Sequence, residues 1–241
     1  MSALLQEVRR ARRDPSLAVL EGFHAVKHAI RFGAEIDRLV CANHEAVADL
    51  SRSLAPDVAE VVAGAQEIGE DALDELTMVP PAGRIVAIAR RPPIDVDALL
   101  ADPAPKPVVL LEAPRRLGNI GACIRVAAAA DAAAVLTTGP ADPWHPDALR
   151  ASAGLHYALP VARVDDPPPV GDRPLAGLVM DGQPLAPGVV PVRAVLAFGT
   201  ERHGLTDDLL AHADLRVAIP MREGVSSLNL ATAVAVTLYR R

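Results

Sequence analysis

The sequence predicts an α/β protein of two units, of which the second contains a mostly parallel sheet covered by helices on both faces. Two observations lead to this prediction. Short apolar or β-branched runs alternate with segments of helical periodicity along the chain, and a proline-rich segment divides the chain in two. A chain of 241 residues with 51% apolar residues also has ample material for the cores of both units.

The first part of the chain is predicted to form a small α/β domain over residues 1–95. Strands are expected at residues 17–22, 36–42, 57–63 and 83–89. Helices are expected at residues 23–33, 44–53 and 71–77. Prolines at positions 92, 93, 103, 105 and 107 then remove backbone donors and prevent a continuous helix. We therefore place a proline-rich linker at residues 96–106.

The second part, residues 107–241, repeats the alternation with better-defined strands. These are expected at residues 108–113, 133–139, 159–164, 175–180, 194–199 and 215–220. Leucine-rich or β-branched strands separated by helices are typical of a parallel sheet that is buried on both faces. Ligands of such sheets bind beyond the carboxyl ends of the strands. Functional residues are therefore sought in the loops that follow the strands.

Composition and charge limit the possible functions. The net charge of −6 argues against a general nucleic-acid coat protein, although 22 of the 24 basic residues are arginines and four of these lie at positions 9–13. These arginines either reflect a GC-biased composition and are simply solvated, or form an arm that contacts phosphates.

No membrane segment is expected in this chain. Charges interrupt every long apolar run, and arginines stand where a secretory signal has its apolar core, so we expect a cytoplasmic protein. Cys41 and Cys123 are interpreted as small buried hydrophobes.

The loop and helix that follow the first strand of the second part contain Asn119, Gly121 and Arg125. Asn119 is interpreted either as a helix cap or as a functional residue. Gly121 and Arg125 are four residues apart and therefore share a helix face. Because glycine has no side chain, a ligand lying over Gly121 could meet the guanidinium of Arg125. Arg125 could equally be an ordinary surface arginine.

Two further loops contain unusual residues. In the first, Gly199 and Gly204 bracket a charged tip, Glu201 is a candidate to act on a substrate, and Thr206 is expected to cap the next helix. In the second, Ser226 or Ser227 is expected to cap the last helix. That helix, residues 228–238, has almost no polar face, which predicts burial in a subunit interface and a dimer.

Several common site patterns are absent from the sequence. It contains no G-x-G-x-x-G dinucleotide fingerprint, no G-x-x-x-x-G-K-[ST] phosphate loop and no G-x-S-x-G motif. The histidines, including His24 and His28 on one helix face, show no metal-ligand spacing with the cysteines, so no metal site is expected.

Taken together, three segments resemble the motifs of a known family in the same order and with the same spacing. They are N-x-G-x-x-x-R at residues 119–125, FGTERHGL at 198–205 and IPMREGVSSLNLATAVAV at 219–236. These resemble the motifs of the SpoU family of RNA 2'-O-ribose methyltransferases, also called the TrmH family, in the SPOUT superfamily. Residues 142–161 are similar to the region between its first two motifs. Residues 17–30 are similar to its RNA-recruiting domain, which resembles kink-turn-binding ribosomal proteins.

The resemblance implies S-adenosylmethionine as the cofactor, held in a deep trefoil knot of the carboxyl-terminal domain. The expected partners are ribosomal or transfer RNA, favoured by the additional amino-terminal domain, and a second copy of the chain in a homodimer. By position, the cofactor-binding residues are Thr138, Gly139, Phe198, Gly199, Thr200, Glu201, Ile219, Met221, Ser227 and Leu228. Arg125 is implied as the catalytic residue, with Asn119, Glu201, Ser227 and Asn229 positioning it or the ribose.

The chemistry of arginine narrows the role of Arg125. A ribose 2'-hydroxyl is a poor nucleophile until it loses its proton, and a guanidinium, which already carries its proton near neutral pH, rarely accepts one. Arg125 is therefore expected to stabilise the developing alkoxide or to orient an RNA phosphate that takes the proton.

Two alternatives remain at this point. One is a catalytically silent RNA-binding or ribosome-assembly protein of the same fold. The other, a nucleotide-dependent oxidoreductase, needs a glycine fingerprint that the sequence lacks.

Overall fold

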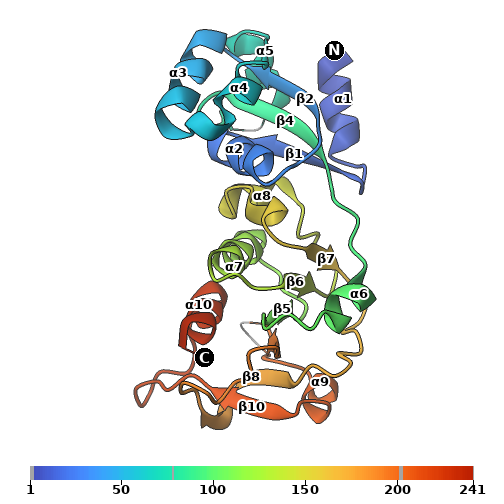
Figure 1. Ribbon diagram of the computed structural model, residues 1–241, viewed down its shortest axis with the longest axis vertical. Helices are drawn as coiled ribbons and strands as arrows, with labels where there is room; N and C mark the ends of the chain where they lie inside the picture. The colour runs from blue at the N-terminus through green and yellow to red at the C-terminus, as the bar shows by residue number, and fades with distance from the viewer. Residues whose placement is uncertain (1–2, 78, 201–202, 241) are drawn as a thin grey trace. The chain divides into compact units, whose positions relative to one another are not determined.

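The computed structural model describes residues 3–77, 79–200 and 203–240, and the chain divides into two compact units (Figure 1). Unit 1 consists of Met1–Pro93 together with Trp144–Ala158, and unit 2 of Ile94–Pro143 together with Leu159–Arg241. Among the described residues, no helix is long and apolar enough to cross a membrane.

Unit 1 contains a four-stranded sheet in which β4 pairs antiparallel with both of its neighbours. The strands, in sheet order, are β1 (Leu17–Glu21), β4 (Ile85–Arg90), β2 (Ile36–Cys41) and β3 (Gln66–Glu67). The helices are α1 (Ala3–Ala11), α2 (Phe23–Arg31), α3 (His44–Leu54), η1 (Pro56–Val58), α4 (Ala59–Val62) and α5 (Glu70–Leu76). The small α/β architecture expected for this part of the chain is present.

One predicted strand of unit 1 is wrong. Residues 57–63 form the end of η1 and α4, and the strand of this region is the short β3. Pro56 occupies the first helical position, where its fixed φ favours a helix. Val58 and Val62 are both buried, and their spacing of four residues places them on one helix face. This short apolar run is therefore compatible with both a strand and a helix, and the helix is the form that buries Val58 and Val62.

The amino-terminal arginine cluster lies on and just after α1, which is anchored to the rest of unit 1. Arg12 donates to Oε1 of Glu21 at 2.8 Å and to the carbonyl of Leu76 at 2.7 Å. This arginine therefore has a structural role. Arg9, Arg10 and Arg13 are exposed.

A segment from much later in the chain completes unit 1. It contains α8 (Pro146–Ala151) and η2 (Leu155–Tyr157). Arg150 forms an ion pair with Glu21 at 2.8 Å. Gly154, with φ of +76°, approaches the backbone of Ala25 so closely that a side chain there would overlap it. Residues 144–158 therefore pack as part of unit 1, although their neighbours in the sequence belong to unit 2.

Unit 2 contains a six-stranded sheet in which all the strand pairs are parallel. The strands, in sheet order, are β10 (Leu215–Ala218), β8 (Leu175–Pro184), β9 (Val195–Phe198), β5 (Val108–Leu111), β6 (Ala134–Thr137) and β7 (Val161–Arg163). The three central strands are buried on both faces, as their continuous apolar sequences predict. All six strands expected for this part of the chain are confirmed.

Helices cover both faces of the unit 2 sheet (Figure 1). They are α6 (Val96–Ala101), α7 (Leu117–Ala129), α9 (Asp207–Ala211) and α10 (Leu230–Arg240). Alternate side chains of the central strands, such as Leu110 and Leu136, form one core cluster with Leu100 of α6 and Leu209 of α9. Helices α7 and α10 pack against each other on the other face.

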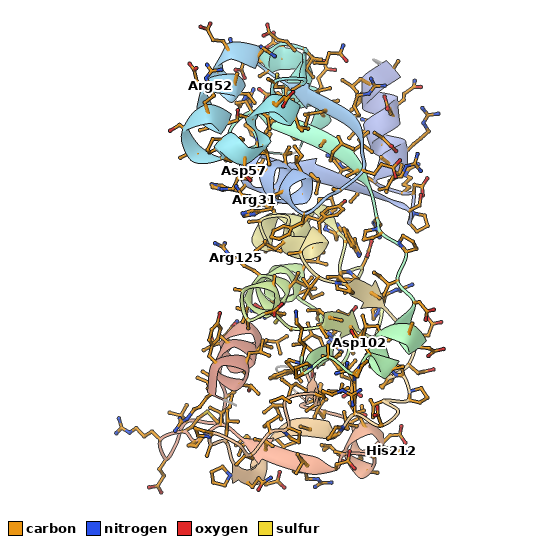
Figure 2. All side chains as sticks on the ribbon, viewed as in Figure 1. Arg31, Arg52, Asp57, Asp102, Arg125 and His212 are labelled. Carbon is orange, nitrogen blue, oxygen red and sulfur yellow. The ribbon has the colours of Figure 1, made fainter. Side chains whose placement is uncertain are left out.

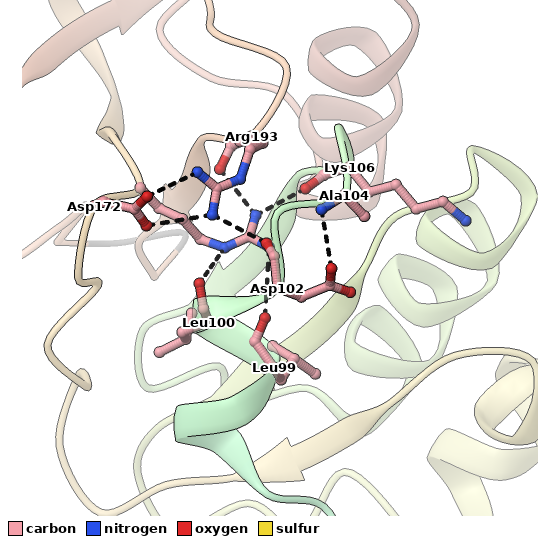
Figure 3. Close-up of polar contacts among 8 residues, drawn as sticks. Leu99, Leu100, Asp102, Ala104, Lys106, Asp172 and Arg193 are labelled. Carbon is pink, nitrogen blue, oxygen red and sulfur yellow. Dashed lines mark hydrogen bonds and ion pairs between the residues drawn. The ribbon is translucent and has the colours of Figure 1, made fainter.

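A buried arginine anchors the segment expected to be a linker, most of which is helix α6. Arg173 is 1% exposed and donates to the carbonyls of Leu100 at 2.8 Å, Asp102 at 2.9 Å and Lys106 at 2.9 Å (Figure 3). It also donates to the carbonyls of Leu99 and Arg193. Burial lowers the pKa of Arg173, and the carbonyls that end α6 compensate for its charge.

Candidate functional site

A cavity of about 590 Å³ lies in unit 2, beside the segments that follow β9 and β10. Its walls combine apolar side chains with the backbone of two loops. It is lined by Leu178, Val179, Met180, Phe198, Gly199, Thr200, His203, Gly204, Leu205, Leu210, Val217, Ile219, Met221, Ser226, Ser227, Leu228, Leu230 and Ala233. Its volume falls in the range of small-molecule sites, about 300–1,000 Å³.

The loop after β9 has a tight backbone geometry. Thr200 and Gly204 exchange two backbone hydrogen bonds, of 3.1 and 3.0 Å. Gly204 has a φ of +67°, and a side chain at Gly199 would overlap the backbone of Gly204. Both glycines are therefore required by this turn. Glu201, expected to be catalytic and to bind the cofactor, lies outside the described residues.

The expected cofactor residues divide into two groups by position. Seven of them line the cavity: Phe198, Gly199, Thr200, Ile219, Met221, Ser227 and Leu228. Thr138 and Gly139 are not among its described lining residues and lie instead at the carboxyl end of β6. There Thr138 Oγ1 accepts a hydrogen bond from the Ala113 amide at 2.9 Å, and Gly139 packs closely against Ala113.

Two asparagines that are 110 positions apart in the sequence meet where α7 and α10 begin. Asn229 Nδ2 donates to Asn119 Oδ1 at 3.1 Å. Asn229 Oδ1 accepts hydrogen bonds from the amides of Ala231 at 2.9 Å and Thr232 at 3.4 Å. Because the oxygen of Asn229 binds the helix amides, its NH₂ group faces Asn119 and orients that side chain.

The asparagine contacts correct two expected helix caps. Helix α7 begins at Leu117 with Arg116 at the cap position, so Asn119 lies inside the first turn and does not cap the helix. Helix α10 begins at Leu230, and Asn229 caps it in place of Ser226 or Ser227. Asparagine and serine are about equally good helix caps, so the residue types alone could not show which of these residues caps α10. The Thr206 cap of α9 is confirmed, with 3.3 Å between its Oγ1 and the Leu209 amide.

Arg125 lies on α7, and its side chain extends away from the helix (Figure 2). It is exposed and forms no hydrogen bond or ion pair with the residues that the structure describes. Gly121, four residues earlier, is buried. The expected ligand surface over Gly121 is therefore not open in this chain, whereas the guanidinium of Arg125 is accessible.

Helix α10 buries most of its apolar side within unit 2. Leu230, Val234, Thr237 and Leu238 are buried, and the Thr237 hydroxyl donates to the Ala233 carbonyl at 2.9 Å. Tyr239 and Leu228 stay 68% and 38% exposed. Packing inside the unit therefore explains much of the apolar character of this helix.

Sequence reasoning missed two residues near the cavity. His203 lines the cavity, and its amide donates to Thr200 Oγ1 at 3.1 Å. Glu112 follows β5 directly, and the residue is only 8% exposed. The one signal for Glu112 in the sequence was a carboxylate placed immediately after a fully apolar strand. Among the described residues, no group of three or more His, Cys, Asp or Glu side chains could hold a metal ion, and both cysteines are buried.

Comparison with known proteins places this site in a family. Residues 106–239 match the SpoU rRNA Methylase family. The chain belongs to that family. The chain is 27% identical, over 96% of its length and 90% of the relative's, to the 23S rRNA (guanosine(2553)-2'-O)-methyltransferase RlmP of Bacillus subtilis. It is 33% identical, over 69% of its length and 62% of the relative's, to the 23S rRNA (uridine(2479)-2'-O)-methyltransferase of Streptomyces viridochromogenes.

A solved SpoU structure agrees with the fold over nearly the whole chain. The SpoU methyltransferase AviRb from Streptomyces viridochromogenes, in complex with the cofactor AdoMet, superposes with a TM-score of 0.79 at 26% identity. The match covers 99% of this chain and 96% of AviRb. The resemblance drawn from the three sequence motifs is thereby confirmed, as is the mostly parallel α/β sheet.

Proposed function

We propose that this chain is an S-adenosylmethionine-dependent methyltransferase that modifies a ribose 2'-hydroxyl of ribosomal RNA. The main support for this proposal is that the three sequence motifs lie close together in unit 2. The second and third motifs line the cavity, and the third contacts the first through the Asn119–Asn229 hydrogen bond. The relatives from Bacillus subtilis and Streptomyces viridochromogenes are named as 23S ribosomal RNA 2'-O-methyltransferases, which supports this substrate class.

The cavity fits S-adenosylmethionine in size and in chemistry. The apolar side chains of Leu178, Met180 and Leu230 offer a surface for an adenine ring, and the backbone around Gly199 and Gly204 offers polar groups at close approach. When bound, the cofactor supplies a methyl group on a sulfonium, which an oxygen nucleophile can accept. Ser227 is exposed at the cavity, where its hydroxyl can bind the cofactor or the ribose.

Arg125 is proposed to act on the ribose oxygen without taking its proton. Its guanidinium is proposed to stabilise negative charge on the 2'-oxygen or to hold an RNA phosphate that accepts the proton. Asn119, oriented by Asn229, is proposed to position Arg125 or the ribose. Glu201, Thr138 and Gly139 keep their proposed roles from the motif positions.

The remaining features of the proposal concern the domains and the assembly. Residues 1–95 are proposed to bind the substrate RNA as kink-turn-binding ribosomal proteins do. Residues 96–106 are proposed as a linker, and residues 107–241 as a catalytic domain that contains a deep trefoil knot. The exposed side chains of Leu228 and Tyr239 support a homodimer built through the catalytic domain. We place the enzyme in the cytoplasm, where ribosomal RNA is found.

The experiment that tests this function is methyl transfer to defined RNAs. The protein is incubated with S-adenosylmethionine carrying a labelled methyl group and with unmodified 23S ribosomal RNA, 16S ribosomal RNA or transfer RNA. Label in 23S ribosomal RNA is the expected result. Label in transfer RNA alone would overturn the proposed substrate class, and RNA binding with no label in any RNA would favour the catalytically silent protein.

A further inference from the structure

A buried carboxylate holds the beginning of α9. Glu112 Oε2 accepts a hydrogen bond from the Thr206 amide at 2.8 Å, and its Oε1 accepts one from the Thr206 hydroxyl at 2.6 Å. Glu112 is only 8% exposed. Thr206 in turn caps α9. Both carboxylate oxygens of Glu112 are therefore engaged with one residue, and hydrogen bonds to a charged acceptor are roughly twice as strong as neutral ones.

The backbone of Glu112 holds the end of the neighbouring strand. Its amide donates to the carbonyl of Phe198, the last residue of β9, at 2.8 Å. Phe198 and Thr206 are the two residues that flank the segment 199–205. The single residue that follows β5 therefore fixes both ends of this loop, one through its backbone and one through its side chain.

The loop held in this way forms one wall of the cavity. Gly199, Thr200, His203, Gly204 and Leu205 all line it. The Thr200–Gly204 backbone pair joins two residues within the loop. The hydrogen bonds of Glu112 instead join both ends of the loop to the residue that follows β5.

We propose that Glu112 is a positioning residue that holds the cavity-lining residues 199–200 and 203–205 in the conformation that binds S-adenosylmethionine. The inference rests on the proposed function, because it names the cofactor of that site. Glu112 does not line the cavity among the described residues, and it acts through Thr206 and the loop.

The test replaces the carboxylate by its neutral isostere. In Glu112→Gln the amide oxygen can still accept from the Thr206 amide, but the charge is lost and the amide nitrogen faces the Thr206 hydroxyl. We expect the dissociation constant of S-adenosylhomocysteine, measured by calorimetry, to rise about tenfold. In steady-state assays the KM for S-adenosylmethionine rises by a similar factor, while kcat at saturating cofactor and the KM for RNA stay close to wild type.

Two further variants separate positioning from general destabilisation. Asp208→Asn removes an exposed carboxylate from the first turn of the same helix and is expected to leave cofactor affinity unchanged. Thr206→Val removes the hydroxyl that donates to Glu112. Because both substitutions disturb the same Glu112–Thr206 pair, the loss of cofactor affinity in the double variant Glu112→Gln/Thr206→Val is expected to be smaller than the sum of the two single losses. Hydrogen exchange of the cofactor-free protein is expected to accelerate in residues 199–206 and to stay unchanged in β5 and β6.

The outcomes distinguish this inference from the function on which it rests. Unchanged cofactor affinity in Glu112→Gln, additive losses in the double variant, or faster exchange throughout unit 2 would overturn the positioning role while leaving the methyltransferase intact. Failure of the wild-type protein to bind either S-adenosylmethionine or S-adenosylhomocysteine would overturn the proposed function and the inference with it.

Discussion

Two arginines of unit 2 have opposite surroundings. Arg173 is 1% exposed and donates to five backbone carbonyls around the end of α6 (Figure 3). Arg125 is exposed on α7, and its guanidinium forms no hydrogen bond with the described part of the chain (Figure 2). Arg125 lies in an apolar stretch and belongs to a sequence motif, whereas Arg173 follows Asp172 and belongs to none of the three motifs, so no role for Arg173 could be predicted from the sequence.

The contrast shows how an arginine can be assigned to structure or to chemistry. All the donor groups of Arg173 that a ligand could use are engaged by carbonyls, and the loss of Arg173 would remove a hydrogen-bond donor from each of these carbonyls. Arg125 forms no hydrogen bond or ion pair with the described residues, and its donors are accessible to an RNA phosphate or to a ribose oxygen. The two residues should therefore respond in opposite ways to substitution, one in stability and the other in activity.

The largest effect is expected for Arg125→Ala. If Arg125 stabilises the developing charge on the ribose oxygen, its removal lowers the methyl-transfer rate by about 10²–10³-fold. Because the side chain is exposed, the free energy of unfolding should change by no more than about 0.5 kcal/mol. Single-turnover transfer and urea denaturation measure the two quantities. Arg216→Ala, which removes an exposed arginine from β10, is the matched control and should transfer methyl groups at nearly the wild-type rate.

The reverse result is expected for Arg173→Met. The methionine fills much of the same space but donates no hydrogen bonds, so several buried carbonyls lose their partner and unfolding becomes easier by about 3 kcal/mol. Urea denaturation of the two variants side by side measures this. Arg193 pairs with the exposed Asp172 at 3.1 Å, and Asp172→Asn is the control with a small expected loss. Wild-type stability in Arg173→Met would contradict the structural assignment.

A smaller effect separates the two roles of Asn229. Asn229→Asp keeps the oxygen that caps α10 but replaces the NH₂ group that faces Asn119 by a second oxygen. We expect stability near that of wild type and a methyl-transfer rate reduced about tenfold, because the Asn119 side chain loses its orientation. Asn229→Ala should also lose about 1 kcal/mol of stability through the missing cap. Equal activity of Asn229→Asp and wild type would show that the asparagine pair serves the fold alone.

The smallest effect is expected in unit 1, where the contact of His28 with a backbone carbonyl should make stability depend on pH. His28 Nδ1 lies 2.7 Å from the carbonyl of Ala153, and burial is the main cause that lowers the pKa of His28 below its usual 6.5. The unfolded chain therefore binds the proton at His28 more readily than the folded chain does. The stability that the neutral, buried His28 contributes is therefore lost as the pH falls below about 6.5. His28→Gln, whose amide can donate to the same carbonyl without titrating, should show a weaker loss of stability between pH 7.5 and pH 5.5. Identical pH profiles would exclude this role of His28.

Local sequence patterns predicted the parallel sheet because its central strands are continuous apolar runs. β5, β6 and β9 are four residues each and completely buried, so length and composition both favoured strands. The same reasoning failed at residues 57–63, where apolar residues also occur at helical spacing and Pro56 starts a helix. Short apolar runs are compatible with both strands and helices, and the packing of their side chains determines which of the two forms.

Long-range contacts explain what the sequence could not predict. The motif residues Asn119 and Asn229 were identified as functional, but their direct hydrogen bond joins positions 110 residues apart. Glu112 and Arg173 are defined by partners in distant elements, and a single carboxylate or arginine in a sequence does not reveal such partners. The packing of residues 144–158 with unit 1 likewise depends on contacts such as Arg150 with Glu21, which no local periodicity encodes.

The most direct test of the central claim is alkaline digestion of the methylated RNA. Unmodified ribosomal RNA is labelled with the wild-type protein, Arg125→Ala or Arg216→Ala, and digested with alkali, which cannot cleave beside a 2'-O-methyl group. We predict label in alkali-resistant dinucleotides for the wild-type protein and Arg216→Ala, and almost none for Arg125→Ala. Label in mononucleotides would mean base methylation, and undiminished ribose label with Arg125→Ala would remove that arginine from the reaction.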